Sequence, residues 1–499
     1  MKNTLFPKRL LAVSYLFFML IGNSIFAQVG IGTITPDPSS ILDVYSSTQG
    51  MLFPRLTTAQ KTAIATPANG LMVYDTDLNA ICYYKTGDGW NALTSIRTRA
   101  NYKLIKSTDV LATILATELA AGGGTKYKLD SSTFYEINGT VAVDKPIDLN
   151  GAYVQGLNVN QDKLVSASGN LFEGSNGGTI KVLTLVASGG GSKVFNIDCT
   201  ANGVPQSFLV RDCVIASSAS VGLVKGLNLV FFNVVHFSGN TTGIKYENIS
   251  NLLLSNMAWF GNNSGTYETY AGTFGLIDKI AGFMDVNSGK TGIDVSANPA
   301  ITGNAYMSDI VFLSSVSTGT FVNPYTVGTY SGYNFDNKWR VVCGGIPNEG
   351  DGYATGTLYL NRTLPYPTTN FTTTGFTKIP GTTIATNFHR VTSPMSNRLL
   401  YSGSKTRQFV VAASISFDTG GSGLTDYLFF FVKWNAAGTT STMLSNTETY
   451  IDTNSGNVQS FSVTGTVTLS VGEYVELCAK KLSGNDKTLT FKSYNMSLK

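Results

Sequence analysis

Three stretches, FLVRDCVIA at 208–216, LVFFNVVHF at 229–237 and LLLSNMAWF at 252–260, repeat one pattern. Each is an apolar run of strand length interrupted by one polar residue, Asp212, Asn233 and Asn256 in turn, at steps of 21 and 23 residues. A repeat of this size with strand-length apolar runs is typical of a β-solenoid. Asp and Asn tolerate the left-handed backbone of a tight turn, and their side chains can bond neighbouring coils. The pattern predicts a right-handed parallel β-helix.

The repeat extends toward the C-terminus. KVFNIDCTANGVPQSFLVRDCVI at 193–215 is echoed by TGIDVSANPAITGNAYMSDIVFL at 291–313, which places Asp309 where Asp212 stands. We therefore expect a structural ladder of polar residues at the turns, and we place the β-helix with its cap at 99–360. A line of ligand-binding groups is the alternative interpretation, but turn stabilisation is favoured. The ladder consists of Asp212, Asn233, Asn256 and Asp309.

A capping helix is expected before the solenoid, over 109–121, because apolar residues recur at helical spacing and three glycines follow. The stretch YKLDSSTFYEINGTVAVDKPIDLNG at 127–151 resembles the opening of pectate-lyase-like and phage-tailspike β-helix proteins, in which a helix caps the solenoid. A cap is needed physically, since an open end would leave strand edges unpaired. The apolar face of this helix is expected to contain Val110, Ile114, Leu115 and Leu119.

The first 27 residues have the pattern of a secretory signal peptide, with a basic start, an apolar core and a cleavage site after Ala27. Its removal takes away Lys2, Lys8 and Arg9 and lowers the formal charge from +4 to about +1. A nearly neutral chain lacks the basic stripe of a nucleic-acid-binding protein. No later stretch reaches the roughly 18 apolar residues of a membrane span. We therefore expect a secreted protein that neither binds nucleic acid nor spans a membrane.

Residues 28–98 are expected to form an N-terminal attachment module, with a helix that starts in a capping box of Thr57 and Gln60 and a β-hairpin after it. The region resembles the N-terminal module of exported surface proteins of Gram-negative bacteria. That module is found at the base of fibre-like and adhesin-like proteins, so the resemblance implies the outer surface of such a bacterium. The resemblance is carried by VGIGTITP at 29–36, ILDV at 41–44, FPR at 53–55, GLMVYDTD at 70–77 and GW at 89–90.

A Thr-, Pro- and Gly-rich connector is expected at 361–394, followed by a head at 395–499. In RQFVVAASISF at 407–417 and DYLFFFVKWN at 426–435, residues alternate strictly between two faces, which predicts a β-sandwich. The phrases NRLLYSG, FVVAASISF and TLSVGEYVELCA resemble the TNF/C1q-like jelly-roll heads at the tips of bacterial and phage fibres. Because such heads usually trimerise, the resemblance implies a homotrimer.

Aromatic residues near an expected coil insertion are candidate ligand-binding groups. The stretch NMAWFGNNSGTYETYAGTFG at 256–275 holds Trp259, Tyr267 and Tyr270 beside Asn and Ser residues, a mixture that suits a sugar surface. Trp434 in the head is a second candidate of the same kind. The alternative is that the aromatic residues fill the solenoid core or a seam between chains.

An enzymatic role on the β-helix is the main competing hypothesis. Glycoside hydrolysis needs two carboxylates held at a defined separation. The triplet from Asn196 to Asp198 resembles the N-x-D element of polygalacturonase-like enzymes, but the partner motifs Asp-Asp, Gly-His-Gly and Arg-x-Lys are absent from the sequence. Arg211 and Asp212 are neighbours in an expected strand, so we place them on opposite faces. His236 and His389 are the only histidines, and for His236, at a strand end, we expect a structural or exposed role rather than that of a general base.

Cysteine usage indicates neither a disulfide framework nor a metal site. The five cysteines are far apart and show no metal-binding spacing, so we expect buried, small apolar side chains. A bridge between Cys199 and Cys213 is the less favoured alternative. No calcium loop is recognisable, and neither a metal nor a cofactor is expected. The cysteines are Cys82, Cys199, Cys213, Cys343 and Cys478.

Together these features predict an all-β protein, with a right-handed parallel β-helix followed by a jelly-roll-like β-sandwich as its C-terminal domain. The expected function is that of a non-catalytic, fibre- or adhesin-like surface protein that binds a glycan or another cell-surface partner. One alternative is a polysaccharide lyase or glycoside hydrolase acting on the β-helix. A further alternative is a phage-derived tail fibre or spike component.

Overall fold

The computed structural model describes residues 15, 28–93, 100–420, 423–454 and 457–499. The chain divides into two compact units, Met1–Arg99 and Ala100–Lys499. Apart from Tyr15, the expected signal peptide lies outside the described residues. None of the described helices is both long and apolar enough to cross a membrane.

The N-terminal unit contains two small sheets. In the first, β1 (Val29–Ile31) pairs in parallel with β2 (Leu42–Val44). The second has the order β3 (Arg55–Leu56), β4 (Met72–Asp75), β5 (Ala80–Lys85), β6 (Gly89–Ala92), and β4 and β5 form the expected hairpin. Helix α2 (Thr58–Thr62) starts at Thr57, where the predicted capping box with Gln60 is present.

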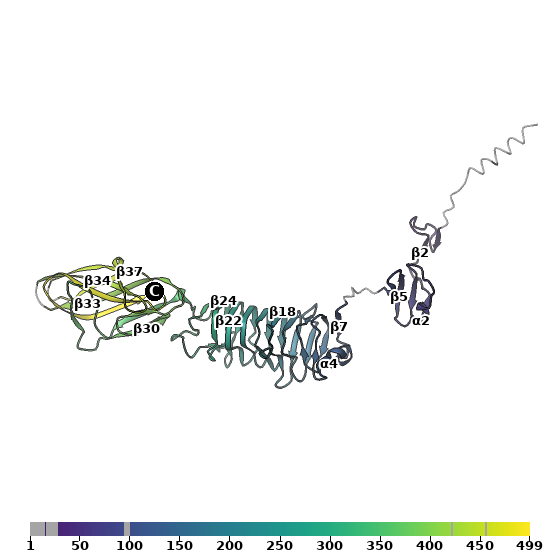
Figure 1. Ribbon diagram of the computed structural model, residues 1–499, viewed down its shortest axis with the longest axis horizontal. Helices are drawn as coiled ribbons and strands as arrows, with labels where there is room; N and C mark the ends of the chain where they lie inside the picture. The colour runs from purple at the N-terminus through teal and green to yellow at the C-terminus, as the bar shows by residue number, and fades with distance from the viewer. Residues whose placement is uncertain (1–14, 16–27, 94–99, 421–422, 455–456) are drawn as a thin grey trace, which may run out of the picture. The chain divides into compact units, whose positions relative to one another are not determined.

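The second unit begins with the predicted β-solenoid, which makes about seven turns. Its strands stack coil upon coil (Figure 1), and every pairing between them is parallel. A continuous apolar core runs inside the coils from Ile105 to Cys343. The strands are β7 (Tyr102–Lys106), β8 (Tyr127–Lys128), β9 (Phe134–Asn138), β10 (Thr140–Ala142), β11 (Ile147–Asp148), β12 (Tyr153–Gln155), β13 (Lys163–Ser166), β14 (Phe172–Gly174), β15 (Gly178–Lys181), β16 (Thr184–Ala187), β17 (Lys193–Asp198), β18 (Ser207–Ala216), β19 (Ser220–Lys225), β20 (Leu229–Ser238), β21 (Ile244–Trp259), β22 (Thr266–Asp285), β23 (Thr291–Asp294), β24 (Ala300–Leu313), β25 (Thr320–Asn323) and β26 (Trp339–Gly344).

The predicted capping helix is split into α3 (Leu111–Ile114) and α4 (Ala116–Ala121). Leu111 and Leu115 are buried in the solenoid core, so the segment does close the end of the stack. Val110, expected on the apolar face, precedes the first helical residue and is exposed.

The long strands change direction at a residue in the left-handed conformation. In β18, β21 and β24 this corner residue is Asp212, Asn256 and Asp309, with φ of 53°, 53° and 59°. These three members of the predicted ladder are therefore confirmed as turn residues. Positive φ is sterically unfavourable for any non-glycine residue, and least so for Asn and Asp.

The fourth ladder residue, Asn233, was assigned to the wrong place. The register pairs Arg211 with Asn233 and Cys213 with Val235, so Val234 is opposite Asp212 and has the corner φ of 55°. The corner therefore recurs after 22 residues and again after 22, not after 21 and 23. Alignment of the buried apolar residues between coils fixes the corner, even though a β-branched residue must then adopt an unfavourable backbone conformation.

Side-chain bonding between coils occurs at a different set of residues. Asn256 donates to its neighbour Ser255 at 3.0 Å rather than to another coil. By contrast, the buried Asn240 amide donates to Asn263 Oδ1 at 2.9 Å, and Asn263 in turn donates to the carbonyl of Phe237 at 2.7 Å. In the next coil, Asn287 donates to the carbonyl of Gly261 at 3.2 Å. These internal amides satisfy buried backbone groups, as a buried polar residue must.

The C-terminal part is the predicted β-sandwich of two antiparallel sheets. One has the order β30-β27-β39-β33-β37, with β28 beside β39; the other has the order β31-β32-β38-β34-β35, with β29 beside β38 and β36 beside β34. The strands are β27 (Thr355–Leu360), β28 (Thr368–Asn370), β29 (Thr377–Lys378), β30 (Thr383–His389), β31 (Val391–Thr392), β32 (Leu399–Tyr401), β33 (Arg407–Thr419), β34 (Leu424–Trp434), β35 (Ser441–Met443), β36 (Thr449–Asn454), β37 (Gln459–Leu469), β38 (Tyr474–Gly484) and β39 (Thr488–Leu498).

The expected alternation in the head is present. Phe409, Val411, Ala413, Ile415 and Phe417 of β33 are all buried in the sandwich core. On β34 the residues Tyr427, Phe429 and Phe431 enter the same core, whereas Phe430 and Val432 join a smaller apolar cluster on the other face.

The expected connector at 361–394 is instead part of the sandwich. Strands β28 to β31 come from this segment, and β27, which was assigned to the solenoid, pairs with β39. The last solenoid strand ends at Gly344. The composition was misleading because Thr is a good strand former, and Pro and Gly are tolerated at short edge strands.

Candidate functional site

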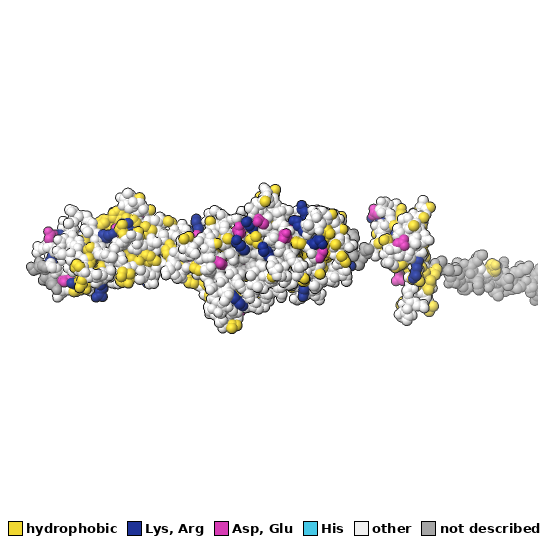
Figure 2. Space-filling model, turned by 90° about the horizontal axis from the view of Figure 1, so that it is seen from below, with side chains coloured by type: hydrophobic (Ala, Val, Ile, Leu, Met, Phe, Trp, Pro, Cys, Tyr) yellow, Lys and Arg dark blue, Asp and Glu magenta, His cyan; other side chains and the backbone are white. Residues whose placement is uncertain are grey.

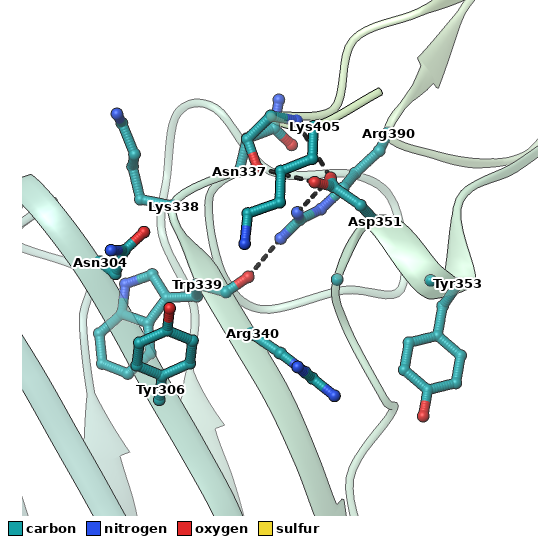
Figure 3. Close-up of a pocket in the computed structure, with 13 residues that line it drawn as sticks. Asn304, Tyr306, Asn337, Lys338, Trp339, Arg340, Asp351, Tyr353, Arg390 and Lys405 are labelled. Carbon is teal, nitrogen blue, oxygen red and sulfur yellow. Dashed lines mark hydrogen bonds and ion pairs between the residues drawn. The ribbon is translucent and has the colours of Figure 1, made fainter. Parts of the chain in front are cut away.

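A cavity of about 460 Å³ opens where the last coils of the solenoid contact the sandwich. Its wall combines the outer side of β24 and β26, the turn at η1 (Asp351–Tyr353) and one loop of the sandwich (Figure 3). The lining residues are Asn304, Tyr306, Asn337, Lys338, Trp339, Arg340, Gly350, Asp351, Gly352, Tyr353, Arg390, Ser404 and Lys405.

One buried arginine fixes the geometry of this cavity. The Arg390 guanidinium lies 2.7 Å from Asp351 Oδ1 and also donates to the backbone carbonyl of Trp339. Asp351 accepts two more hydrogen bonds, from the backbone N–H of Ser404 at 3.0 Å and from its hydroxyl at 2.7 Å. The sandwich loop is further tied down by a 2.7 Å bond between Tyr330 and Ser402. These hydrogen bonds hold the wall in place, and of the Arg390 guanidinium only the buried Nε has no hydrogen-bond partner among the described residues.

The accessible charge in the cavity is positive. Arg390 is neutralised by Asp351: burial raises the pKa of that carboxyl, but hydrogen bonds from Arg390 and Ser404 outweigh the burial and hold it below its ordinary value. Lys338, Arg340 and Lys405 are exposed, and no ion pair among the described residues includes them. Three cations are thus free to meet an anionic ligand.

Two tyrosines provide apolar surface with polar tips in the same wall. Tyr306 on β24 is half-buried, and Tyr353 is 43% exposed. Figure 3 shows their side chains together with those of Lys338 and Arg340 around the cavity, with the Arg390 contacts drawn beside them. Aromatic faces next to cationic and amide groups match the mixed polar and apolar surface of a sugar.

A second, shallower hollow of about 380 Å³ shares Tyr306 and Arg340 with the first. The strand register places Asp278, Tyr306 and Arg340 side by side on β22, β24 and β26. Asp309, the last corner residue, also lines this hollow. Two carboxylates, a phenol and a guanidinium therefore face one open groove that continues into the cavity.

Three of the four predicted ligand-binding residues are inside the protein. Trp259, Tyr267 and Tyr270 are 0% exposed, so the prediction that they bind a ligand is wrong. The Trp259 ring stacks between Phe237 and Tyr267, at centroid distances of 3.8 and 5.0 Å. The alternative interpretation, that aromatic residues fill the solenoid core, describes them correctly. The expected insertion is a short loop, and its flanking strands place these side chains inward.

Trp259 and Tyr270 also hold a buried charge. Trp259 Nε1 donates to Glu268 Oε1 at 2.8 Å, and the Tyr270 hydroxyl donates to Glu268 Oε2 at 2.7 Å. Lys279 Nζ lies 2.9 Å from the same carboxylate, and both charged side chains are almost fully buried. The cluster stabilises an ion pair in the core and has no opening to ligand.

Trp434 is half-buried on the second sheet of the sandwich and is not among the residues that line either hollow. Its ring stacks on Tyr474 at 6.0 Å and packs with Phe376 against the small cluster of Phe430, Val432 and Cys478. Its indole N–H has no hydrogen-bond partner among the described residues. Its binding role stays a prediction.

The residues considered for catalysis do not form a catalytic group. Asn196 bonds to Glu173 at 3.2 Å, and Asp198 lies 3.7 Å from Lys225. Arg211 and Asp212 were expected on opposite faces, but their charged groups lie 3.9 Å apart, because the corner conformation of Asp212 turns both outward. In the described part of the chain no three His, Cys, Asp or Glu side chains gather as a metal site requires, and the five cysteines are free and buried.

Two buried titratable groups lie behind the cavity wall. His389 Nε2 accepts the backbone N–H of Gly350 at 3.2 Å, and burial lowers the pKa of His389 to about 4. Glu349 accepts the N–H groups of Asn334 at 2.7 Å and Phe335 at 3.0 Å, while burial raises its pKa to about 7. His236, the other histidine, is exposed and lies edge-on to Phe260.

Residues 30–109 match a family model described as a phage tail like trimerisation region. No curated protein matches the chain. The match covers the N-terminal module and reaches into β7, the first strand of the solenoid. This suggests that the chain assembles as a homotrimer.

Three solved structures show a distant likeness. Eiger TNF from S. frugiperda is 12% identical, with a TM-score of 0.21 over 29% of this chain and 90% of that chain. ORF18 of Geobacillus virus E2 is 11% identical, with a TM-score of 0.21 over 84% and 89%. Pantoea stewartii WceF, described as a glycan biofilm modifying enzyme with a bacteriophage tailspike-like parallel β-helix fold, is 10% identical, with a TM-score of 0.22 over 83% and 62%. TM-scores this low do not establish a shared fold, which rests here on the strand pairing of the chain itself.

Proposed function

We propose that this protein is a secreted, trimeric, fibre-like surface component that binds an anionic glycan without cleaving it, in the cavity between its solenoid and its sandwich. The observation that carries the proposal is the group of three exposed, unpaired cations beside two tyrosines in a preorganised wall. The trimerisation-region match and the solenoid support the fibre-like part of the proposal. Secretion rests on the signal-peptide pattern of residues 1–27.

The chemistry of the wall selects for negative charge on the sugar. Arginine can form two parallel hydrogen bonds to a carboxylate, and lysine adds a strongly hydrated positive charge. The tyrosine rings can cover the apolar face of a sugar ring while their hydroxyls remain free to bond its oxygens. A glycan that carries carboxylate or sulfate groups therefore fits better than a neutral one.

The test is binding of the full chain to matched charged and neutral oligosaccharides, such as oligogalacturonate and its methyl ester. Loss of Arg340 in Arg340→Ala should weaken binding about 10-fold or more, since a hydrogen bond to a charged group contributes about 1.5–3 kcal/mol. Arg362→Ala is the matched control, because Arg362 is exposed and lies outside both hollows. Equal affinity for the charged and neutral sugars would contradict the proposal.

Cleavage of the same polymer is the second candidate function. It is favoured by one observation, the presence of Asp278 and Asp309 in the groove that also contains Tyr306 and Arg340. A pair of carboxylates flanking a bound sugar is the minimum requirement of most glycoside hydrolases. Release of reducing or unsaturated ends, abolished in both Asp278→Asn and Asp309→Asn, would establish an enzyme. Binding without any released ends would support the non-catalytic function.

A further inference from the structure

We infer that Asn202, which precedes Gly203 in the loop between β17 and β18, is a site of spontaneous deamidation to aspartate and isoaspartate. Asparagine followed by glycine is the pair in which this reaction is least hindered, because glycine has no Cβ beside the attacking nitrogen. The loop lines neither of the two hollows, so the reaction is independent of the proposed glycan binding.

Deamidation at such a pair is an attack of the backbone on the side chain. The glycine nitrogen loses its proton and bonds to Cγ of the asparagine, while the bond from Cγ to Nδ2 breaks and Nδ2 leaves as ammonia with that proton. Water then opens the resulting succinimide ring at either of its carbonyl groups, so one ammonia is lost and one water is taken up. The reaction therefore requires an available glycine N–H, an activated Cγ and room for the ring.

The glycine N–H is available at Asn202 but not at the other Asn-Gly pairs. An N–H that already donates a hydrogen bond must give up that bond before it can lose its proton. The Gly203 N–H makes no hydrogen bond to any residue that the structure describes. In the other four pairs, Gly70 donates to the carbonyl of Tyr84 at 2.7 Å, Gly139 to Asp162 Oδ1 at 2.8 Å, Gly151 to the carbonyl of Gly177 at 2.8 Å and Gly177 to Gln206 Oε1 at 3.3 Å.

The side chain of Asn202 is also held in position for the attack. Its Oδ1 accepts the backbone N–H of Val204 at 3.2 Å, so the side chain folds forward over the peptide bond to Gly203. A donor on this oxygen stabilises the negative charge that develops there when Cγ is attacked. Three of the other asparagines use Oδ1 differently: Asn69 accepts from the N–H of Thr86, Asn150 from Asn176 Nδ2 and Asn176 from Asn202 Nδ2.

The surroundings of Gly203 leave room for the ring and for water. A Cβ added to Gly203 would have no heavy atom within 4 Å, and the next residue, Val204, is 64% exposed. At Gly177, by contrast, an added Cβ would lie 1.8 Å from the carbonyl oxygen of Ser207. The backbone is therefore open at the first glycine and enclosed at the second.

Conversion of Asn202 removes one member of a ladder of asparagines that joins three coils. Asn202 Nδ2 donates to Asn176 Oδ1 and, at 3.1 Å, to the carbonyl of Ser175, and Asn176 Nδ2 donates to Asn150 Oδ1 at 2.9 Å. A carboxylate has no N–H to donate, so at position 202 it would face the oxygen atoms that the amide now bonds. Deamidation should therefore loosen the loop at 199–206 from the preceding coil.

The product also carries a negative charge in an uncharged segment. Residues 199–210 include no Lys, Arg, Asp or Glu, so the new carboxylate has no cationic partner in its own loop. The solenoid face shown in Figure 2 differs, since cationic and anionic side chains are interspersed on it. Anion-exchange chromatography should therefore retain the modified chain more strongly than the native chain.

The test is peptide mapping by mass spectrometry of the full chain after storage in neutral and mildly alkaline buffer. We expect conversion at Asn202 to be several times faster than at Asn150 or Asn176, and to accelerate with pH because the glycine nitrogen must lose its proton. The chain unfolded in denaturant is the matched reference, in which the Asn-Gly pairs should convert at similar rates. A folded chain in which Asn202 converts no faster than Asn150 or Asn176 would overturn the inference.

Two variants test the role of the glycine nitrogen, with circular dichroism to confirm that each is folded. Gly203→Ala should slow conversion at Asn202 several-fold, because the added Cβ hinders the attacking nitrogen and has space in the folded chain. Gln206→Ala should accelerate conversion at Asn176, since the Gly177 N–H loses its acceptor, and should leave Asn150 unchanged. Unchanged rates in both folded variants would show that the glycine N–H does not control the reaction, and the inference would be wrong.

Discussion

Arg390, which follows β30 in the sandwich, donates a hydrogen bond to the backbone carbonyl of Trp339, the first residue of the last solenoid strand. The same guanidinium pairs with Asp351, and the arginine is only 2% exposed. One side chain thus joins the two parts of the second unit and shapes the wall of the cavity.

Arg390→Ala should lower the free energy of unfolding by about 3–5 kcal/mol, because it leaves the poorly exposed Asp351 carboxylate without its cation. The same variant should weaken glycan binding, since the wall that carries Lys405 would lose its anchor. Denaturant titration and sugar titration measure the two effects. Arg362→Ala should change stability by no more than about 0.5 kcal/mol.

The stability of the second unit should depend on pH through two opposing groups. Glu349 has a pKa raised from 4.5 to about 7, so its contribution is fully present below pH 4.5 and is lost as pH rises through 7. His389 has a pKa lowered from 6.5 to about 4, so its contribution is present above pH 6.5 and is lost as pH falls through 4.

Glu349→Gln should therefore gain stability relative to the native protein as pH rises from 5 to 8, by up to about 3 kcal/mol. Thermal unfolding at a series of pH values tests this, with Glu448→Gln as a control on an exposed carboxyl. If the difference between Glu349→Gln and the native protein does not change with pH, the burial argument for Glu349 is incorrect.

Val182→Asn should stabilise the solenoid. Val182 has a φ of 53°, a conformation that disfavours a β-branched residue and suits Asn. Relief of this conformational cost should raise the free energy of unfolding by about 1 kcal/mol. Val186→Asn, in the extended strand β16, should instead be destabilising. Comparison of the two variants therefore separates the effect of the positive φ at Val182 from the general effect of replacing Val by Asn.

Glu268→Gln should destabilise the protein by about 3–5 kcal/mol. The substitution leaves Lys279 as an uncompensated charge in the core. Glu247→Gln removes a partly exposed partner of Lys225 and Lys245, and should cost no more than about 1 kcal/mol. An equal loss in the two variants would contradict the assignment of a buried pair.

The solenoid could be predicted from sequence because its signal is repetitive. Asp212, Asn256 and Asp309 lie at corners, where Asn and Asp have the lowest conformational energy of the non-glycine residues at positive φ. The corner position of Val234 could not be predicted from the sequence. The register of the buried residues on neighbouring coils decides where the corner falls, and the local conformational preference of valine does not indicate it. Trp259 was misassigned for a similar reason: alternation shows that two faces exist, but does not show which one is inside.

The cavity could not be predicted at all from local pattern. Tyr306, Arg340, Tyr353 and Lys405 come from four different segments and form no motif in the sequence. Arg340 becomes a candidate only when the register places it beside Tyr306 and Asp278. The single earlier hint was Asp309, which was identified as a turn residue and also lines the adjoining groove.

The corner residues also show that the length of the solenoid depends on the number of coils and not on the number of residues in each coil. Between Asp212 and Asn256 each coil uses 22 residues, whereas the step from Ala281 to Asp309 takes 28, yet the strands remain in register. Extra residues are therefore absorbed in loops without a change in rise. Insertion or deletion of one whole coil would shift the cavity by about 4.8 Å relative to the capping helices and leave its lining unchanged, so the reach of such a protein can be adjusted in steps, independently of what it binds.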